Sequence, residues 1–177
     1  MPMIRSPIPS LDGHFTERLR FRAATMDDAG WWMAYIQDAR SIRFMPFTLG
    51  SAADCTLFIR RSMDRYAADG SGLHAIVERN TGVPVGMVGL LTQLVDDEPE
   101  LEIGYHLVPS ATGQGYATEA AIACKRFAQA HALAPCVISL IDPRNFASQA
   151  VARRNGMVHE KDTVHRGMPA MVWRVGF

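Results

Sequence analysis

The chain has 177 residues, of which 48% are hydrophobic and 20% charged, as is ordinary for one globular domain with a full core. Its 18 Lys and Arg residues equal its 18 Asp and Glu residues, and this balance argues against a general nucleic-acid binder, whose affinity comes largely from neutralising phosphates. The three cysteines lie far apart, and no C-x-x-C or H-E-x-x-H spacing occurs, so the sequence disfavours a zinc site and indicates a reducing compartment.

The first residues contain several prolines and no long apolar run. We therefore expect no signal peptide and no membrane span, which needs roughly 18 consecutive apolar residues, and we expect a cytoplasmic protein. Because proline prevents regular structure, we expect residues 1–14 to form a flexible arm. Residues 15–177 show no repeat and no linker, and they are expected to form one domain.

Apolar periodicity and helix-capping signals define the elements of the first half. Thr25 with acids in the following turn is typical of a helix start, and Ser51 with Asp54 three residues on is a second such signal. The patterns predict a strand at 16–22, a helix from Thr25, an irregular segment at 38–50, a helix at 51–68, strands at 72–78 and 83–94, and an acidic turn at 95–99.

The stretch 101–119, LEIGYHLVPSATGQGYATE, combines a strand, a glycine-bearing loop and a helix start. Residues 102–108 alternate as a half-buried strand does, and Pro109 ends it because proline cannot donate to the sheet ladder. The first turn of a helix has unpartnered N–H groups, and glycines let a phosphate approach them. Gly113 and Gly115 are placed for such an anion site.

Two common phosphate-binding motifs fit this loop poorly. A P-loop requires a lysine after its last glycine, where this chain has Tyr116. A dinucleotide fingerprint requires a third small residue, where Thr118 stands. Asp142 could be its ribose-binding acid, but too little chain follows Gly113 for several further βα units.

The last part of the chain has the same alternating character. A β-rich run predicts a fifth strand at 136–141, and Asn155-Gly156 is typical of the end of a short helix at 146–154. Residues 158–162 and 168–175 are expected to form a final hairpin.

Three segments, 16–22, 102–120 and 145–157, resemble the GCN5-related N-acetyltransferases in the expected order. Within the middle segment, residues 112–117 resemble the acyl-CoA loop Q/R-x-x-G-x-G/A, with Thr112 in place of Gln or Arg. Its continuation GQGYATEA at 113–120 and the opening TERLRFR at 16–22 resemble the branch that acetylates the N-termini of ribosomal proteins. The last segment, 145–157, resembles the second cofactor-contacting motif, N-x-x-S-x-x-(V/L)-x-x-(K/R)-x-G-(F/M).

This resemblance implies an α/β (α+β) fold of one domain, with a mixed, mostly antiparallel sheet of about seven strands and about four helices. The fourth and fifth strands would splay apart, and the pantetheine arm would pair there as an extra strand. It implies acetyl-CoA as co-substrate with no metal, an amine acceptor (a protein N-terminus or a small molecule), no DNA or membrane partner, and a monomer or homodimer. The cofactor-binding residues implied are Leu107, Val108, Thr112, Gly113, Gln114, Gly115, Tyr116, Ala117, Thr118, Asn145 and Ser148.

Two proton transfers would accompany the attack of a neutral amine on the thioester. The resemblance implies that Ser148 protonates the leaving CoA thiolate, and it makes Glu102, directly or through water, a candidate base. His106 has the better unperturbed pKa for a base. Strand alternation places both on one face roughly 13 Å apart, so one of them is the expected base. The alternative to an enzyme is a non-catalytic acyl-CoA-binding module, which would need no proton donor.

Overall fold

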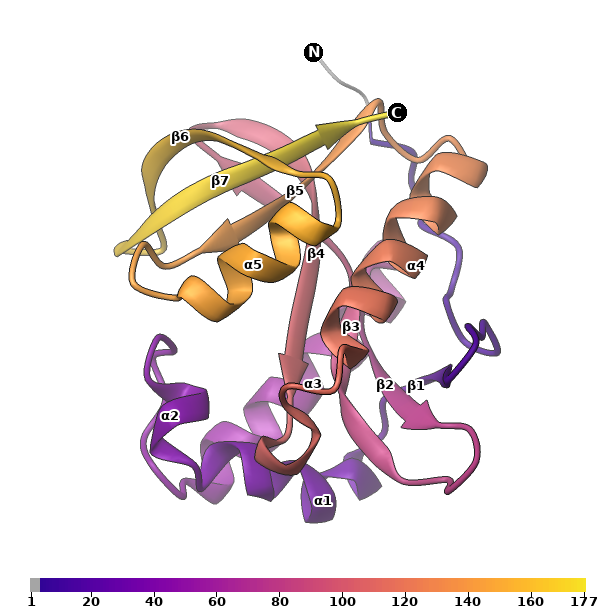
Figure 1. Ribbon diagram of the computed structural model, residues 1–177, viewed down its shortest axis with the longest axis vertical. Helices are drawn as coiled ribbons and strands as arrows, with labels where there is room; N and C mark the ends of the chain where they lie inside the picture. Colours follow the sequence, from indigo (N-terminus) through magenta and orange to yellow (C-terminus); the bar gives the residue numbers. More distant parts are fainter. Residues whose placement is uncertain (1–3) are drawn as a thin grey trace.

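A seven-stranded sheet in the order β1-β2-β3-β4-β5-β7-β6 organises residues 4–177, the part of the chain that this computed structural model describes (Figure 1). Neighbouring strands are antiparallel except β4 and β5, which are parallel. This mixed, mostly antiparallel sheet confirms the expected fold class. The strands are β1 Leu19–Ala23, β2 Gly72–Glu78, β3 Pro84–Val95, β4 Glu98–Leu107, β5 Cys136–Ile141, β6 Val158–His165 and β7 Met168–Gly176.

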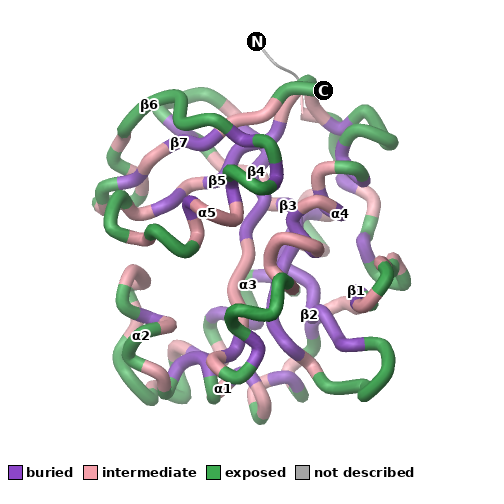
Figure 2. Tube along the Cα trace, in the orientation of Figure 1, coloured by how far each residue is buried: buried purple, intermediate pink, exposed green. Residues whose placement is uncertain are grey.

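Helices cover both faces of the sheet. Figure 1 shows α3 behind the sheet and α4 and α5 in front of it, and α3 contacts β2 whereas α4 contacts β3 and β4. Because both faces are covered, β2 is buried along its whole length, and Figure 2 shows the centre of the sheet as the most buried region. The helices are α1 Ala29–Ile36, α2 Ala39–Ile42, α3 Ala52–Ala68, α4 Tyr116–Ala130 and α5 Phe146–Arg154.

The sheet opens between β4 and β5. β3 and β4 pair continuously from Gly86–Leu107 to Val95–Glu98, whereas β4 and β5 share only the pair Glu102–Ile138. Next to that pair the Ser139 hydroxyl donates to the Ile103 carbonyl at 2.8 Å. Beyond this bridge the strands diverge, which confirms the predicted splay and leaves the end of β4 without a neighbour on its β5 side.

The N-terminal segment differs from the expected flexible arm. Ile8 and Leu11 are only 4% and 2% exposed, and the backbone N–H groups of Arg5 and Ile8 donate to Leu133 and Asp69. The prolines do exclude regular structure from residues 4–14, but the apolar side chains between them still bury against the body. Residues 1–3 of the predicted arm lie outside the described residues.

Three element boundaries also differ from the sequence predictions. The segment 38–50 contains a short helix, α2, because Asp38 caps it by accepting from the Ser41 backbone N–H at 3.0 Å. The acidic turn is tighter than expected, since β4 already begins at Glu98. The first strand begins at Leu19 rather than residue 16, because Thr16 to Arg18 turn towards α4.

No helix within residues 4–177 is both long and apolar enough to cross a bilayer.

Candidate functional site

A cleft of about 1770 Å³ occupies the opening between β4 and β5. It runs from the N-terminal end of α4, past the splayed strands, to α3 and the β6–β7 turn. Ten of the predicted site residues line it, although they come from three separate segments of the chain. These are Glu102, His106, Leu107, Thr112, Gly113, Gly115, Ala117, Thr118, Asn145 and Ser148.

One end of the cleft has the backbone geometry of an anion site, in residues 112–115, which we call the anion loop. Gly113 and Gly115 have φ values of +76° and +82°, a left-handed conformation that glycine adopts without strain, and Gly115 is the N-cap of α4. Within residues 4–177 the backbone N–H groups of Gly113, Gln114 and Gly115 donate no hydrogen bond to another backbone group, and Figure 2 shows this loop exposed. Free N–H groups at the positive end of the helix dipole suit a phosphate.

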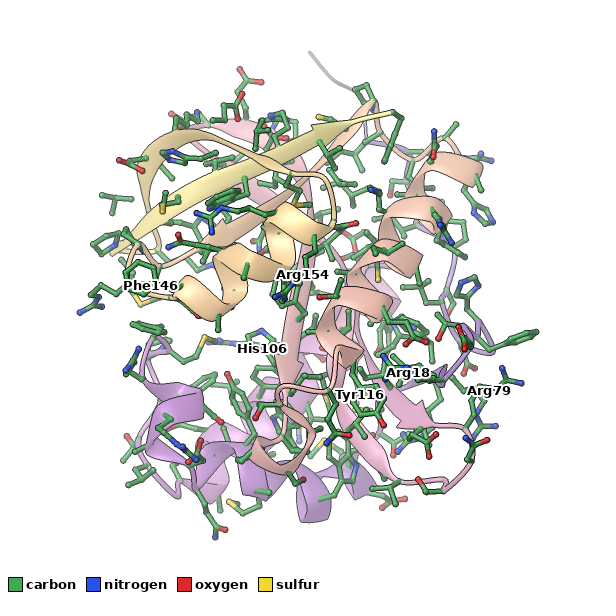
Figure 3. All side chains as sticks on the ribbon, viewed as in Figure 1. Arg18, Arg79, His106, Tyr116, Phe146 and Arg154 are labelled. Carbon is green, nitrogen blue, oxygen red and sulfur yellow. The ribbon has the colours of Figure 1, made fainter. Side chains whose placement is uncertain are left out.

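The loop is held by a clamp that joins two of the three segments singled out in the sequence. The Glu119 carboxylate accepts from the Thr16 hydroxyl at 2.6 Å and forms an ion pair with Arg18 at 2.6 Å. Arg18 also donates to the Gln114 carbonyl at 2.9 Å and lies over the Tyr116 ring (Figure 3). Burial raises the pKa of Glu119, but the bonds from Thr16 and Arg18 outweigh this and lower it. The charged opening segment is therefore a structural support for the anion loop.

Three predicted cofactor residues do not line the cleft. Val108 is buried in the core at 6% exposure, since it follows the end of β4 and faces inward. Gln114 turns away to donate to the Ser110 carbonyl at 2.9 Å. The Tyr116 ring packs against the Arg18 guanidinium (Figure 3). Only their backbone groups remain available to a ligand.

Ser148 and Asn145 meet at the start of α5. The Asn145 side chain caps the helix by accepting from the Ser148 backbone N–H at 3.1 Å, and the Tyr105 hydroxyl donates to the Ser148 carbonyl at 2.7 Å. These bonds fix the Ser148 backbone, while the Ser148 hydroxyl has no hydrogen-bond partner in the described part of the chain and lines the cleft. Tyr105 was not predicted as a site residue, because only the fold brings β4 beside α5.

Glu102 lies at the last point where β4 and β5 pair. The residue is 8% exposed, and its carboxylate accepts from the Gln93 side-chain amide at 2.6 Å. Burial raises the pKa of Glu102, and the bond from Gln93, a backbone bond from Leu140 and the charges of Arg65 and Arg166 offset this only in part. A carboxyl whose pKa is raised by burial is a stronger base when ionised than an exposed one.

His106 lies on the same face of β4 as Glu102, as strand alternation predicts. It is packed edge-on against Tyr35 and Phe58, and its Nδ1 lies 3.0 Å from the Tyr35 hydroxyl. Burial lowers the pKa of His106 to about 4. The imidazole is therefore neutral at pH 7 but a weak base, so this environment favours Glu102 for proton removal.

The other end of the cleft is lined by the irregular segment after α1 and by cationic side chains. From that segment the cleft is lined by Arg40, Phe44, Met45 and Phe47, whereas Arg43 lies over the Phe44 ring. Sequence reasoning missed four polar residues at this end, which come from three elements, namely Arg61, Arg65, Gln93 and Arg166. The spacing of Arg61 and Arg65 indicates one helix face, but no sequence signal connects them with Arg166.

The cleft also passes between α4 and α5. Arg126 and Arg154 line it there, and Figure 3 shows Arg154 projecting from α5 towards α4. Within residues 4–177 no group of three His, Cys, Asp or Glu side chains is placed to hold a metal ion. The charge available to an anionic ligand thus comes from backbone dipoles and arginines.

Comparison with known proteins connects this site to acyl transfer. The sequence model of the acetyltransferase (GNAT) domain family matches residues 18–158. YkkB of Bacillus subtilis, an uncharacterized protein, is 33% identical over 104 residues, which amount to 59% of this chain and 60% of that relative's length.

Solved structures share the whole fold. An acetyltransferase from Agrobacterium tumefaciens has a TM-score of 0.75 at 26% identity, covering 100% of this chain and 95% of that one. The Salmonella typhimurium acetyltransferase that modifies the N-terminal serine of ribosomal protein L7/L12 has a TM-score of 0.72 at 16% identity, covering 92% and 96%. RimL, an L7/L12 alpha-N-protein acetyltransferase solved with coenzyme A, has a TM-score of 0.71 at 17% identity, covering 91% and 95%.

Proposed function

Since the chain belongs to the GNAT acetyltransferase family, whose domain model matches residues 18–158, we propose that it transfers an acetyl group from acetyl-CoA to a primary amine by direct attack in a ternary complex. The observation that carries the proposal is the cleft itself. It joins an anion-binding loop, an opened sheet edge, a free hydroxyl and a buried carboxyl in one continuous space. Each of these corresponds to one requirement of the reaction.

Acetyl-CoA would enter with its pyrophosphate at the start of α4. The N–H groups from Gly113 to Ala117 would bind the phosphates, and the Thr16–Arg18–Glu119 clamp keeps the loop in place. The pantetheine amides would pair with the β4 backbone beyond Ile103, which has no β5 neighbour. The thioester would then lie at the splay, between Glu102 and Ser148.

The amine nitrogen would attack the thioester carbon, forming a C–N bond and breaking the C–S bond. Glu102 would accept the proton that the amine loses, directly or through one water. Ser148 would donate its hydroxyl proton to the departing thiolate and regain one from solvent. Holding both substrates in one cleft would itself lower the barrier, by on the order of 7–11 kcal/mol at best.

The acceptor is either a protein α-amine or a small-molecule amine. Structural neighbours acetylate the N-terminus of a ribosomal protein, which favours a protein α-amine, and a small-molecule amine is the second candidate. The rival function is an acyl-CoA-binding module without catalysis. The free Ser148 hydroxyl and the raised pKa of Glu102 favour the enzyme, because a sensor requires neither.

Release of the CoA thiol tests the proposed function. The protein is mixed with acetyl-CoA and, in turn, with α-amino, ε-amino and small aliphatic amines, and free thiol is followed with a thiol-reactive dye. We expect amine-dependent thiol release with acetylated amine formed in equal amount. Tight binding of acetyl-CoA in calorimetry with no thiol release from any amine would identify the binding module instead.

Replacing Gly115 by valine should abolish acetyl-CoA binding. A side chain there must adopt φ +82°, and its Cβ would lie 3.3 Å from the Arg18 guanidinium, beside the N–H groups of the loop. The matched control is Gly82→Val in the β2–β3 turn, where φ is +72° and nothing lies within 4 Å of the added Cβ. Both variants carry similar backbone strain, so calorimetry should show lost affinity only for Gly115→Val. If both variants fold and bind acetyl-CoA with equal affinity, the phosphates of acetyl-CoA do not bind at this loop.

A further inference from the structure

Three arginines converge at the end of the cleft opposite the anion loop. Arg61 and Arg65 project from one face of α3, since they are four residues apart, and Arg166 lies in the β6–β7 turn. All three line the cleft. We call Arg61, Arg65 and Arg166 the arginine cluster.

The arginine cluster has no carboxylate partner. Within residues 4–177 none of its members forms an ion pair. Arg65 uses one nitrogen to donate to the Thr92 carbonyl at 2.9 Å. The nearby Asp69 carboxylate instead accepts from Ser71 and Thr92. Most guanidinium donors in the cluster therefore remain free.

The members of the arginine cluster repel one another. Burial lowers the pKa of Arg65, and the charges of Arg166 and Arg61 lower it further against the opposing effect of Asp69 and Glu102. Like charges four residues apart on a helix are destabilising. An unpaired cluster in a cleft is stabilised when a bound anion enters, and guanidinium groups match carboxylate and phosphate geometry.

The arginine cluster is connected to the proposed base through one side chain. Arg166 donates to the Gln93 side-chain oxygen Oε1 at 3.2 Å, and the Gln93 side-chain nitrogen Nε2 donates to Glu102 at 2.6 Å. An anion held by the cluster would thus lie within about one side-chain length of the group that receives the amine proton. The acceptor end of the cleft is cationic, whereas the base is a single buried carboxyl.

We propose that the acceptor is an amine with its own anionic group, a carboxylate or phosphate a few bonds from the nitrogen, which the arginine cluster binds so that the amine faces Glu102. This inference rests on the proposed acetyl transfer and specifies its substrate class. It excludes polyamines and other polycationic amines as good acceptors, because the cluster repels them. Both a small anionic amine and a peptide with an acidic residue next to its N-terminus present the required chemistry.

Matched acceptor pairs test the charge requirement. O-phosphoethanolamine is compared with ethanolamine, alanine with alaninamide, and a tetrapeptide with Asp at its second position with the same peptide carrying Lys. We expect the anionic member of each pair to have a KM lower by at least roughly 10-fold, as the loss of one charged hydrogen bond implies, and this advantage to shrink as salt is added. The acceptor pair with the largest KM ratio between its two members shows whether the anionic amine is a small molecule or a peptide.

Variants of the arginine cluster give the second readout. Arg61→Gln with Arg166→Gln should raise the KM for the anionic acceptor roughly 10- to 100-fold, with the KM for acetyl-CoA unchanged. The control is Arg60→Gln, an exposed arginine on the same helix that does not line the cleft. Acetylation that is equally efficient for both members of every pair, or best for spermidine, overturns this inference and leaves the proposed function standing. Failure to acetylate any amine overturns both.

Discussion

Glutamine in place of Glu102 is expected to slow acetyl transfer by about 10²- to 10³-fold, within the usual range for a positioned general base. The change conserves shape and keeps one acceptor oxygen, so the bond from the Gln93 amide can still form while the ability to accept a proton is lost. Acetyl-CoA affinity should stay nearly constant, because the anion loop lies elsewhere in the cleft. Single-turnover rates and calorimetry on the same preparations measure the two effects.

The pH dependence identifies the role of Glu102. In the wild type the rate should fall as the pH drops through the raised pKa of this carboxyl, since the base becomes protonated. The variant should lose this pH dependence and keep only the one that comes from deprotonation of the amine, whose pKa is about 8 for an α-amine. Glu98→Gln, at an exposed position four residues earlier on β4, should leave rate and profile unchanged. If the pH–rate profile of Glu102→Gln equals that of the wild type, Glu102 is not the base and His106 is the remaining candidate.

Stability measurements test whether misfolding, rather than loss of the base, slows the Glu102→Gln variant. Because burial raises the pKa of Glu102 above the unfolded value of about 4.3, the native state holds more protons than the unfolded state between those two values. Wild-type stability therefore falls as the pH rises through this window. Glutamine does not titrate, so at pH 7 the variant should have a Tm equal to or above that of the wild type.

Replacing Ser148 by alanine is expected to slow the chemical step by about 10²-fold, the lower end for loss of a positioned proton donor. Alanine removes the free hydroxyl but keeps the backbone N–H that Asn145 caps and the carbonyl that accepts from Tyr105. Alanine also favours the helix, so α5 and acetyl-CoA affinity should persist. A wild-type single-turnover rate in this variant would mean that water protonates the thiolate.

Asn145 provides the comparison for Ser148. Asn145→Ala removes the cap of α5 and should cost about 1 kcal/mol of stability, together with weaker acetyl-CoA binding because it loosens the turn that lines the cleft. Asn145→Asp keeps the capping oxygen and should restore the Tm. If Asn145→Asp is stable yet still binds acetyl-CoA poorly, the Asn145 amide nitrogen contacts the cofactor directly.

Local patterns were sufficient for the elements that carry their own signals. The anion loop is predictable because positive-φ glycines and a helix start are adjacent in the sequence, as at Gly113 and Gly115. The placement of Glu102 and His106 on one face of β4 follows from strand alternation in the same way. The apolar pattern did not show that residues 4–14 pack, because burial of Ile8 and Leu11 depends on what the rest of the fold places beside them.

The sequence by itself determined the order of strands and helices and the glycine loop before α4, because each of these depends on neighbours within one or two turns. Only the tertiary structure decided which distant groups meet. It placed Arg18 against Glu119, Tyr105 beneath Ser148 and Arg166 beside α3, and it set the pKa of Glu102 and of His106 in opposite directions through burial. These are long-range contacts and desolvation effects, and their strength depends on the packed three-dimensional environment rather than on sequence spacing.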